Sequence, residues 1–411
     1  MDRPGGSERR VEVSRQSWGS RLRGAVSGVV VGLVLLAVAA VLLFLNEGRA
    51  VRRAQALEEG ARRVQPLSDP APAPERDGSL VHTVGRAVAH EVLEDPALGV
   101  RAPALKLLRS VEMYQWQEET RSEERAKVGG GTEKVKTTSY TRGWSDSPID
   151  SNRFAEPAGH QNPPFPLTGQ EWVASEIRLG GLRLGQALVD QLGRRETLSP
   201  DEQTIERARG LLGRPVAVSQ DGLYVGARPA APEIGDLRIA HSVVRPADVS
   251  VVAELRGDAL ETYRTTNRGT IALLEYGTVT AEQMFAAARA GNRRLTWILR
   301  FAGFCAFVLG FAAVLRPLRV AVDVIPPLGR LVGAGLGVAS LGLAAISTLV
   351  VIAAGWMFYR PVLAGVLFAL ALAVVVWLWR RTRRRSERSS GAEETKVPPL
   401  PESPERGGGR P

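Results

Sequence analysis

The feature that most constrains this chain is a long apolar block near its C-terminal end, from Leu331 to Trp379. A short polar break, Tyr359-Arg360-Pro361, divides the block into two runs. Each run is close to the roughly 20 residues that an α-helix needs to cross a bilayer. The break is too polar for hydrocarbon, so it predicts a tight turn at a membrane surface, with Trp356 and Tyr359 at the headgroup level. We therefore predict a membrane hairpin with transmembrane helices at 331–357 and 361–379.

Two further apolar runs precede this hairpin. The run 25–45 carries no charge and exceeds the about 7–15 apolar residues of a signal peptide. No small-residue cleavage site ends it, which favours a retained first transmembrane helix over a signal peptide. The run 295–315 predicts a second crossing, interrupted near its start by Arg300. Arg300 either extends to the interface or is a functional charge within the membrane, and its place near the helix end favours the first interpretation.

The middle of the chain, 46–294, reads as a soluble domain. Its first part predicts an amphipathic helix, in which Ala50, Ala54, Leu57, Ala61 and Val64 recur every three or four positions, either continuous with the first crossing or separate from it. From about 78 to 278, short β-prone segments bounded by Gly, Pro, Asp or Asn recur, and Gln186–Leu192 and Pro200–Leu212 favour helix. Another helix begins at Thr280 and leads into the second apolar run. The triplet Gly129-Gly130-Gly131 predicts a hairpin loop between two of the strands. The predicted strands are Ser79–Val84, Val111–Glu118, Val135–Thr141, Asp236–Val244, Val249–Leu255 and Ile271–Tyr276.

The fold class that follows is a multi-pass α-helical membrane protein. It has four transmembrane helices in a one-plus-three arrangement, with a large α+β or β-rich soluble domain between the first and the second. The single cysteine, Cys305, lies in an apolar run, so no disulfide forms within one chain and no cysteine-based zinc site exists.

Arginine clusters predict the orientation in the membrane. The formal net charge is +10, and no nucleic-acid-binding motif accompanies it, so basic residues beside crossings are the better explanation. The arm 1–24, the loop after the second crossing and the tail 380–411, which begins with Arg380 and is too polar to fold, are basic. The positive-inside rule places all three in the cytoplasm and the soluble domain on the exoplasmic face. Basic residues also flank the crossings on the domain side, but long domains translocate largely regardless of charge. These residues are Arg49, Arg52, Arg53, Arg293 and Arg294.

Glycines spaced by four predict close helix packing. Gly28 and Gly32 share one face of the first crossing, and Gly329, Gly333 and Gly337 share one face of the third. Small residues at this spacing let a second helix approach closely, within the chain or between copies.

Several stretches, in this order and with this layout, resemble the transmembrane protein 43 (LUMA) family over about residues 32–379. They are Asn46-Glu47-Gly48-Arg49-Ala50, Val111-Glu112-Met113-Tyr114-Gln115-Trp116, Gly235-Asp236-Leu237-Arg238, and Ala353-Ala354-Gly355-Trp356-Met357-Phe358-Tyr359-Arg360-Pro361.

The resemblance implies a multi-pass protein with a large lumenal or exoplasmic domain between its first two crossings. In eukaryotes the family is associated with the endoplasmic reticulum and inner nuclear membrane. It is thought there to organise membrane protein complexes, including emerin and lamins, and to self-associate. Members also occur in bacteria, and the Arg-, Ala- and Gly-rich composition suits a bacterial member in a cell membrane. The family brings no established catalytic residues.

Candidate chemistry is sparse. His90-Glu91 is not followed by a second histidine in the HExxH pattern, His160 reads as a turn residue, and His82 and His241 lie in strand-like stretches. No phosphate-binding or nucleophile-elbow motif is present. We therefore predict no catalytic residue, no metal site and no cofactor.

Two motifs of the soluble domain invite a binding interpretation. Glu112, Tyr114 and Trp116 alternate along one strand and form either a groove for a peptide or lipid or, as aromatic residues more often do, half-buried packing. Asp236 and Arg238 fall on one face of a strand start, where they pair with each other or with a neighbouring strand. Such pairs are worth about 0–1 kcal/mol when exposed, so we interpret them as structural.

The function predicted from these features is a non-enzymatic membrane scaffold that binds the lipid bilayer, itself and other membrane proteins. It has no nucleic-acid partner and no known small-molecule substrate. A channel or transporter subunit is the alternative, but the crossings offer few polar residues to line a pathway. A membrane-anchored hydrolase is less favoured, because it requires acids or histidines clustered in a pocket.

Overall fold

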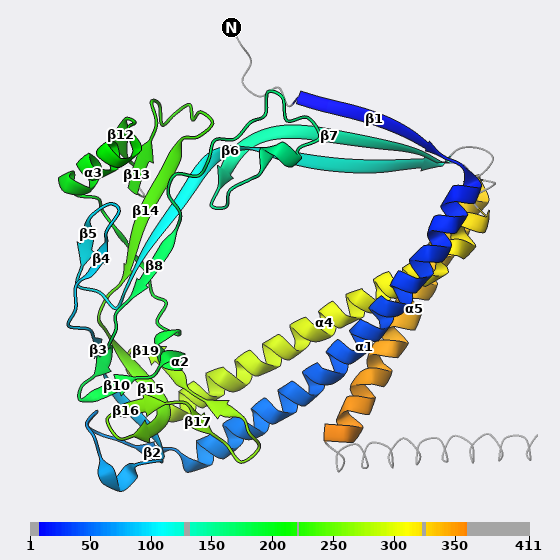
Figure 1. Cartoon of the computed structure of the whole chain (residues 1–411). Coiled ribbons are helices and arrows are strands. Elements are labelled where there is room, and N and C mark those ends of the chain that lie inside the picture. Colours follow the sequence, from blue (N-terminus) through cyan, green and yellow to red (C-terminus); the bar gives the residue numbers. More distant parts are fainter. Residues whose placement is uncertain (1–7, 127–131, 220–221, 323–325, 360–411) are drawn as a thin grey trace, which may run out of the picture. The chain divides into compact units, whose positions relative to one another are not determined.

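The computed structural model describes residues 8–126, 132–219, 222–322 and 326–359 of the 411-residue chain (Figure 1). In these ranges, 3 helices are long and apolar enough to cross a membrane, and a large β-rich domain lies between the first and second of them in the chain. The predicted fold class is confirmed in this form. The predicted crossing 361–379, its preceding turn at Arg360 and Pro361, and the tail 380–411 lie outside the described residues. The three helices are α1 (Trp18–Arg63), α4 (Ala281–Val322) and α5 (Pro326–Tyr359).

Helix α1 is much longer than the predicted crossing 25–45. It begins after Ser17, whose side chain caps the first turn, and has 46 residues. At 1.5 Å per residue it is about 69 Å long, more than twice the roughly 30 Å thickness of bilayer hydrocarbon. The helix continues beyond the apolar run because nothing breaks it before Pro66 and because its second half keeps an apolar face.

Helix α4 also exceeds its prediction. It begins before the predicted crossing 295–315 and continues through Pro317 to Val322. A proline removes one backbone donor, and transmembrane helices tolerate this loss where neighbouring groups re-satisfy the backbone. Helix α5 begins at Pro326, where proline's missing N–H is harmless because the first-turn donors have no partner within the helix.

The soluble domain contains two large sheets. The first has 8 strands, and its central neighbours β7, β6, β14 and β13 are all antiparallel. Strand β8 pairs with β6, and β11 pairs with β14. The strands are, in spatial order, β1 (Glu8–Gln16), β7 (Thr132–Ser145), β6 (Lys106–Ala126), β14 (Leu237–Val244), β13 (Gly222–Val225) and β12 (Val216–Ser219), with β8 (Gln170–Val173) and β11 (Glu196–Leu198) beside them.

The second sheet has 7 strands, and its longest pairing joins β15 to β3. Its strands are β19 (Leu273–Tyr276), β15 (Ala247–Arg256), β16 (Ala259–Glu261), β10 (Leu182–Leu184), β9 (Arg178–Leu179), β3 (Leu80–Val88) and β2 (Gln65–Pro66). Two small ribbons and short helices complete the domain: β4 (Leu93–Asp95) with β5 (Val100–Ala102), β17 (Tyr263–Arg264) with β18 (Thr270–Ile271), α2 (Gln186–Val189), α3 (Glu202–Leu212), and 3-10 turns at Pro74–Arg76 and Ser151–Arg153.

Both sheets contribute to one apolar core. Leu107, Val111 and Met113 of β6 belong to the same buried cluster as Val249 and Val251 of β15. Over residues 111–116 of β6, buried residues alternate with half-buried ones, as expected for a strand with one face on the core. All six predicted strands occur, and β6 and β7 are far longer than the segments that propensity marks.

The N-terminal arm 1–24 is not a separate segment where it is described. Residues Glu8–Gln16 form β1, which pairs antiparallel with β7 from Glu8↔Tyr140 to Gln16↔Thr132. The pairing places Glu12 opposite Lys136, a favourable cross-strand charge pair. Sequence periodicity missed β1 because its polar residues do not alternate regularly with apolar ones.

Helices α1 and α4 pack side by side along their apolar runs (Figure 1). A Cβ built on Gly32 would lie 2.9 Å from the carbonyl oxygen of Gly310 and 2.9 Å from Cγ2 of Val314. Gly32 therefore lets the two backbones approach closely, as its spacing predicts. Gly28 does not share this role, since its Cβ position has no described neighbour within 4 Å.

We predict that Gly32→Leu destabilises the α1–α4 pair by about 1–3 kcal/mol, because a leucine cannot fit without separating the helices. Thermal or denaturant unfolding of the purified protein in detergent measures the effect. Gly28→Leu is the matched control and should leave stability nearly unchanged. Equal effects of the two substitutions would contradict the packing described above.

Candidate functional site

A polar network joins α1 to α4 where their apolar runs meet the soluble domain. We call it the junction network, and its members are Asn46, Glu47, Arg49, Asn292, Thr296 and Arg300. Asn46, Glu47 and Thr296 are buried. Asn46, Glu47 and Arg49 belong to a family-like stretch of the sequence and Arg300 interrupts the second apolar run, but no sequence pattern connects them.

The strongest contact in the junction network is an ion pair. The Arg300 guanidinium donates from Nε and Nη2 to the two carboxylate oxygens of Glu47 at 2.7 and 2.8 Å. Arg300 also lies over the ring of Trp297, 4.9 Å from its centroid. This bidentate geometry combines charge with two parallel hydrogen bonds. Arg300 therefore has a partner of opposite charge within the helix pair, which neither interpretation of this residue included.

Arg49 organises the rest of the junction network. Its guanidinium donates to Asn292 Oδ1 at 3.0 Å, to Asn46 Oδ1 at 3.0 Å and to Thr296 Oγ1 at 3.1 Å. Asn292 in turn donates from Nδ2 to the Ala50 carbonyl at 3.0 Å. Most of the links cross between the helices, so the network fixes their axial register as well as their contact.

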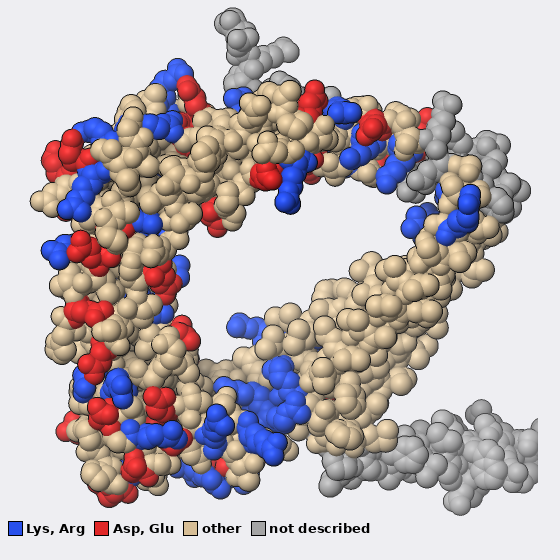
Figure 2. All heavy atoms as spheres, in the orientation of Figure 1, with Lys and Arg blue, Asp and Glu red and all other residues tan. Residues whose placement is uncertain are grey.

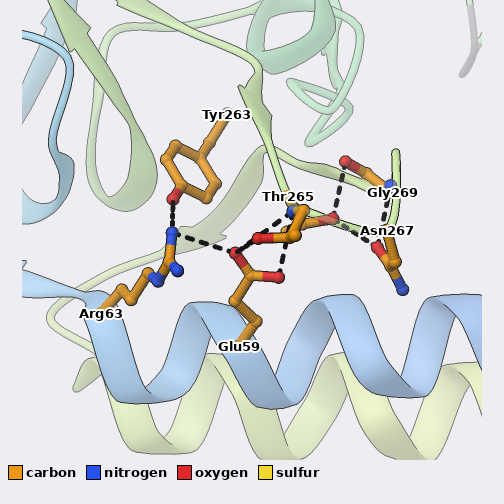
Figure 3. A network of polar contacts seen from close by, with 7 residues as sticks. Glu59, Arg63, Tyr263, Thr265, Asn267 and Gly269 are labelled. Atoms are coloured by element: carbon orange, nitrogen blue, oxygen red, sulfur yellow. Dashed lines mark hydrogen bonds and ion pairs between the residues drawn. The ribbon is translucent and has the colours of Figure 1, made fainter.

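The second half of α1 is clamped to the soluble domain (Figure 3). The Glu59 carboxylate accepts the backbone N–H of Thr266 at 3.1 Å and pairs with Arg63 at 3.1 Å. Arg63 donates to the Tyr263 hydroxyl at 3.1 Å. Asn267 donates to the Arg52 carbonyl at 2.8 Å. The loop after β17 is thus tied to the helix by both side-chain and backbone contacts.

Apolar contacts reinforce this clamp. Leu57 of α1 and Met284 and Phe285 of α4 belong to one buried cluster with Ile271 of β18. The loop also lies very close to the helix, since a Cβ on Gly269 would fall 2.5 Å from the Cβ of Ala56. Burying such side chains is worth about 1.5–3 kcal/mol each, so the apolar cluster outweighs the exposed polar contacts of the clamp.

Basic side chains surround the junction. In Figure 2, Lys and Arg gather over the domain-side ends of α1 and α4, whereas the middle of the helix pair shows neither sign of charge. Such a distribution is typical of a membrane boundary, where arginines contact lipid headgroups.

The predicted strand motif Glu112, Tyr114 and Trp116 lies on the half-buried face of β6, opposite the core. Tyr114 packs against Trp144 of β7 with ring centroids 5.2 Å apart, and Arg142 lies 5.1 Å from the centre of the Trp116 ring. The face is filled by neighbouring strands and loops, which favours the packing interpretation over a ligand groove.

Asp236 and Arg238 are predicted to pair either with each other or with a neighbouring strand, and the contacts that they make are to neighbouring strands and loops. Asp236 is buried and accepts hydrogen bonds from the Tyr224 hydroxyl, from Arg214 and, at 2.8 Å, from the backbone N–H of Glu233. Burial and the bond to Asp236 raise the pKa of Tyr224 above its ordinary value. Arg238 instead lies over the Trp144 ring, 4.1 Å from its centroid. Spacing alone failed here because Arg214 comes from a different part of the chain.

A buried charged cluster in the domain escaped sequence analysis. Asp95 accepts from Arg109 at 2.5 Å and pairs with His241 Nε2 at 2.9 Å. Burial acts to raise the pKa of Asp95, but the hydrogen bonds from His241 and Arg109 outweigh it and hold that pKa below its ordinary value. The cluster joins β4, β6 and β14 and is satisfied internally. Among the described residues no group of three His, Cys, Asp or Glu is placed to hold a metal ion.

The remaining predicted residues lie in helices. Gly48 is buried in α1, and Gly355, Trp356 and Tyr359 lie in the last turns of α5. Gly329 lies in the first turn of α5. A Cβ on Gly333 would meet the Arg319 side chain at 3.0 Å, whereas a Cβ on Gly337 would meet no described atom within 4 Å.

A β-rich domain joined by a buried network to helices of membrane-spanning length defines a multi-pass integral membrane protein. The model of one protein family, transmembrane protein 43, matches residues 113–361. Similar proteins include transmembrane protein 43 of Rattus norvegicus, 35% identical over 87% of this chain and 90% of the relative, and that of Homo sapiens, 35% identical over 88% and 92%. A Drosophila melanogaster homolog is 30% identical over 85% and 93%. The chain therefore belongs to the transmembrane protein 43 family. No solved structure matches it.

We predict that Glu47→Gln lowers the free energy of unfolding in detergent by about 1.5–3 kcal/mol, because it removes the charged hydrogen-bond acceptor of the half-buried Arg300. The double substitution Glu47→Leu with Arg300→Leu should cost less than the single one, since no charge is then left alone.

Glu58→Gln is the matched control for this prediction. Glu58 pairs with Arg62 on the same helix, but both side chains are exposed. Its loss should change stability by only about 0–1 kcal/mol. A double substitution more damaging than Glu47→Gln would show that the pair contributes net stability.

Proposed function

We propose that this protein is a non-enzymatic membrane scaffold that assembles through its transmembrane helices. One observation carries the proposal. The glycine face shared by α1 and α4 is filled within the chain, at Gly32 and Gly310, whereas no described atom lies within 4 Å of the Cβ position of Gly337 on α5. A bare backbone face of this kind is the surface that a second transmembrane helix packs against.

The chemistry of the described residues supports a non-enzymatic role. The most buried ionisable cluster consists of Asp95, Arg109 and His241, whose polar groups pair with one another. The transport alternative receives less support, because the buried charges of α1 and α4 sit at one level and neutralise each other. A conduction pathway requires polar groups along its length.

We predict that Gly333→Leu with Gly337→Leu lowers self-association, because leucine side chains would keep another helix at a distance. Crosslinking in native membranes and the oligomeric mass in mild detergent are the measurements. Gly335→Leu is the matched control, since Gly335 lies on the opposite face of α5 and its Cβ position has no described neighbour within 4 Å either.

Two outcomes would count against this use of the face. Unchanged assembly in the double variant would remove the glycine face from the interface. Reduced thermal stability with unchanged assembly would instead assign the face to a helix of the same chain.

We further propose that both termini are cytoplasmic and that the soluble domain is exoplasmic, in a bacterial cell membrane. This orientation competes with the β1–β7 pairing described above, because a crossing at 25–45 would place β1 and the domain on opposite faces of the bilayer. The free energies favour insertion of the run 25–45 into the membrane over the β1–β7 pairing. A run of about 20 mostly aliphatic residues gains roughly 0.3–0.6 kcal/mol for each Leu or Val in a bilayer. Exposed edge pairing over nine positions is opposed by the chain entropy of ordering the strand.

We predict that cysteines at Val11 and Thr137, which face each other in the β1–β7 register, form no disulfide in membranes. The background carries Cys305→Ser, and cysteines at Thr120 and Thr138, opposite each other between β6 and β7, are the positive control. After oxidation, a protease cleaves the chain between the two cysteines of each pair. The mobility of the fragments on a gel then shows whether a disulfide joins them. Equal crosslinking of the two pairs would overturn the proposed orientation.

A further inference from the structure

An apolar groove runs along α1 on the side of the helix next to its contact with α4. It has a volume of about 750 Å³ and is lined by Val38, Val41, Leu42 and Leu45 of α1 together with Leu299 of α4. The α1 residues recur every three or four positions and therefore share one helix face. They belong to the apolar run of the first crossing, so the groove lies at the depth of lipid hydrocarbon.

One end of the groove is cationic. Arg49 and Arg52 line it on the side of the soluble domain, next to Asn46. Arg49 is held in place by its hydrogen bonds to Asn292 and Thr296 at 3.0 and 3.1 Å, so its charge is fixed at the groove end before anything binds. The Arg52 side chain is exposed at the rim. The surface thus combines an apolar channel with a positive end at the membrane boundary.

We infer that this groove binds one anionic phospholipid from the leaflet next to the soluble domain. An acyl chain lies along Val38, Val41 and Leu45, and the phosphate contacts the Arg52 guanidinium beside Arg49. The charge pattern selects this occupant. A second apolar helix brings no anion to the arginines, and a zwitterionic lipid brings a cationic group that offsets its phosphate. The inference is independent of the scaffold role.

The volume is consistent with a lipid contact of this kind. Sites for small molecules occupy about 300–1,000 Å³ and combine an apolar lining with a few placed polar groups. Here the polar groups are gathered at one end, as an amphiphile requires. Basic pockets between transmembrane helices recognise lipid head groups by the same physical rule.

The test uses the full chain purified in neutral detergent and native mass spectrometry with phosphatidylglycerol and phosphatidylcholine of identical acyl chains. The unmodified protein should retain phosphatidylglycerol in preference. Arg52→Gln should lower that preference about fivefold, the effect of one basic side chain near an anionic headgroup. Val41→Trp should fill the groove and lower the retention of both lipids.

Two control variants keep the test specific. Arg294→Gln removes an exposed arginine of α4 near the same membrane boundary, and Val30→Trp adds bulk to an exposed position of α1; neither residue lines the groove. Both should behave like the unmodified protein. Equal losses in Arg52→Gln and Arg294→Gln would overturn the inference in favour of diffuse basic attraction. Equal retention of the two lipids would overturn it as well. A change of oligomeric mass in Val41→Trp with lipid retention unchanged would assign the groove to a second copy.

Discussion

The ion pair between Glu47 and Arg300 is the constraint on which the membrane part of this structure depends. Each charge alone would cost about 2.5–3.5 kcal/mol near the centre of a membrane helix on insertion scales, and less toward its ends. The two side chains come from different helices and meet at 2.7 Å. A shift of either helix by one turn, about 5.4 Å, would therefore break both hydrogen bonds of this pair. The pair sets the register of α1 against α4 for everything above and below it.

The apolar contacts follow that register. Four residues before Glu47, Leu43 lies against Gly303, and seven residues further back Leu36 lies against Gly310. The steps along α4 from Arg300 are similar, as antiparallel helices require. A large residue on one helix thus faces a glycine on the other at successive levels, and the α1 backbone approaches α4 directly at Gly32. This is how helices pack where lipid removes the hydrophobic driving force between them.

Sequence patterns predicted the parts of this structure that depend on local rules. Apolar run length located the helices, and β-propensity located strands such as β14 and β15, because both signals lie within a few residues of each other. Sequence patterns did not predict which residues the charged side chains pair with. Glu47 and Arg300 are separated by 253 positions in the chain. Asp236 pairs with Arg214 and not with the nearby Arg238. Spacing identifies residues that share one face of a helix or strand. Tertiary structure decides which of several basic side chains pairs with an acidic residue on that face.

The end of α1 depends on a second anchor, on the apolar face that its periodicity predicts. About ten residues, or roughly 15 Å, separate Glu47 from Leu57, which is buried against the domain. Rotating α1 by one residue, about 100°, would turn Glu47 toward lipid and withdraw Leu57 from its cluster at the same time. Because Glu47 and Leu57 lie on one rigid helix, a rotation of α1 would break the polar contact and the apolar contact together. The helix pair is consequently a fixed extension of the β-rich domain, and a partner that binds the helices is held in a defined orientation to that domain.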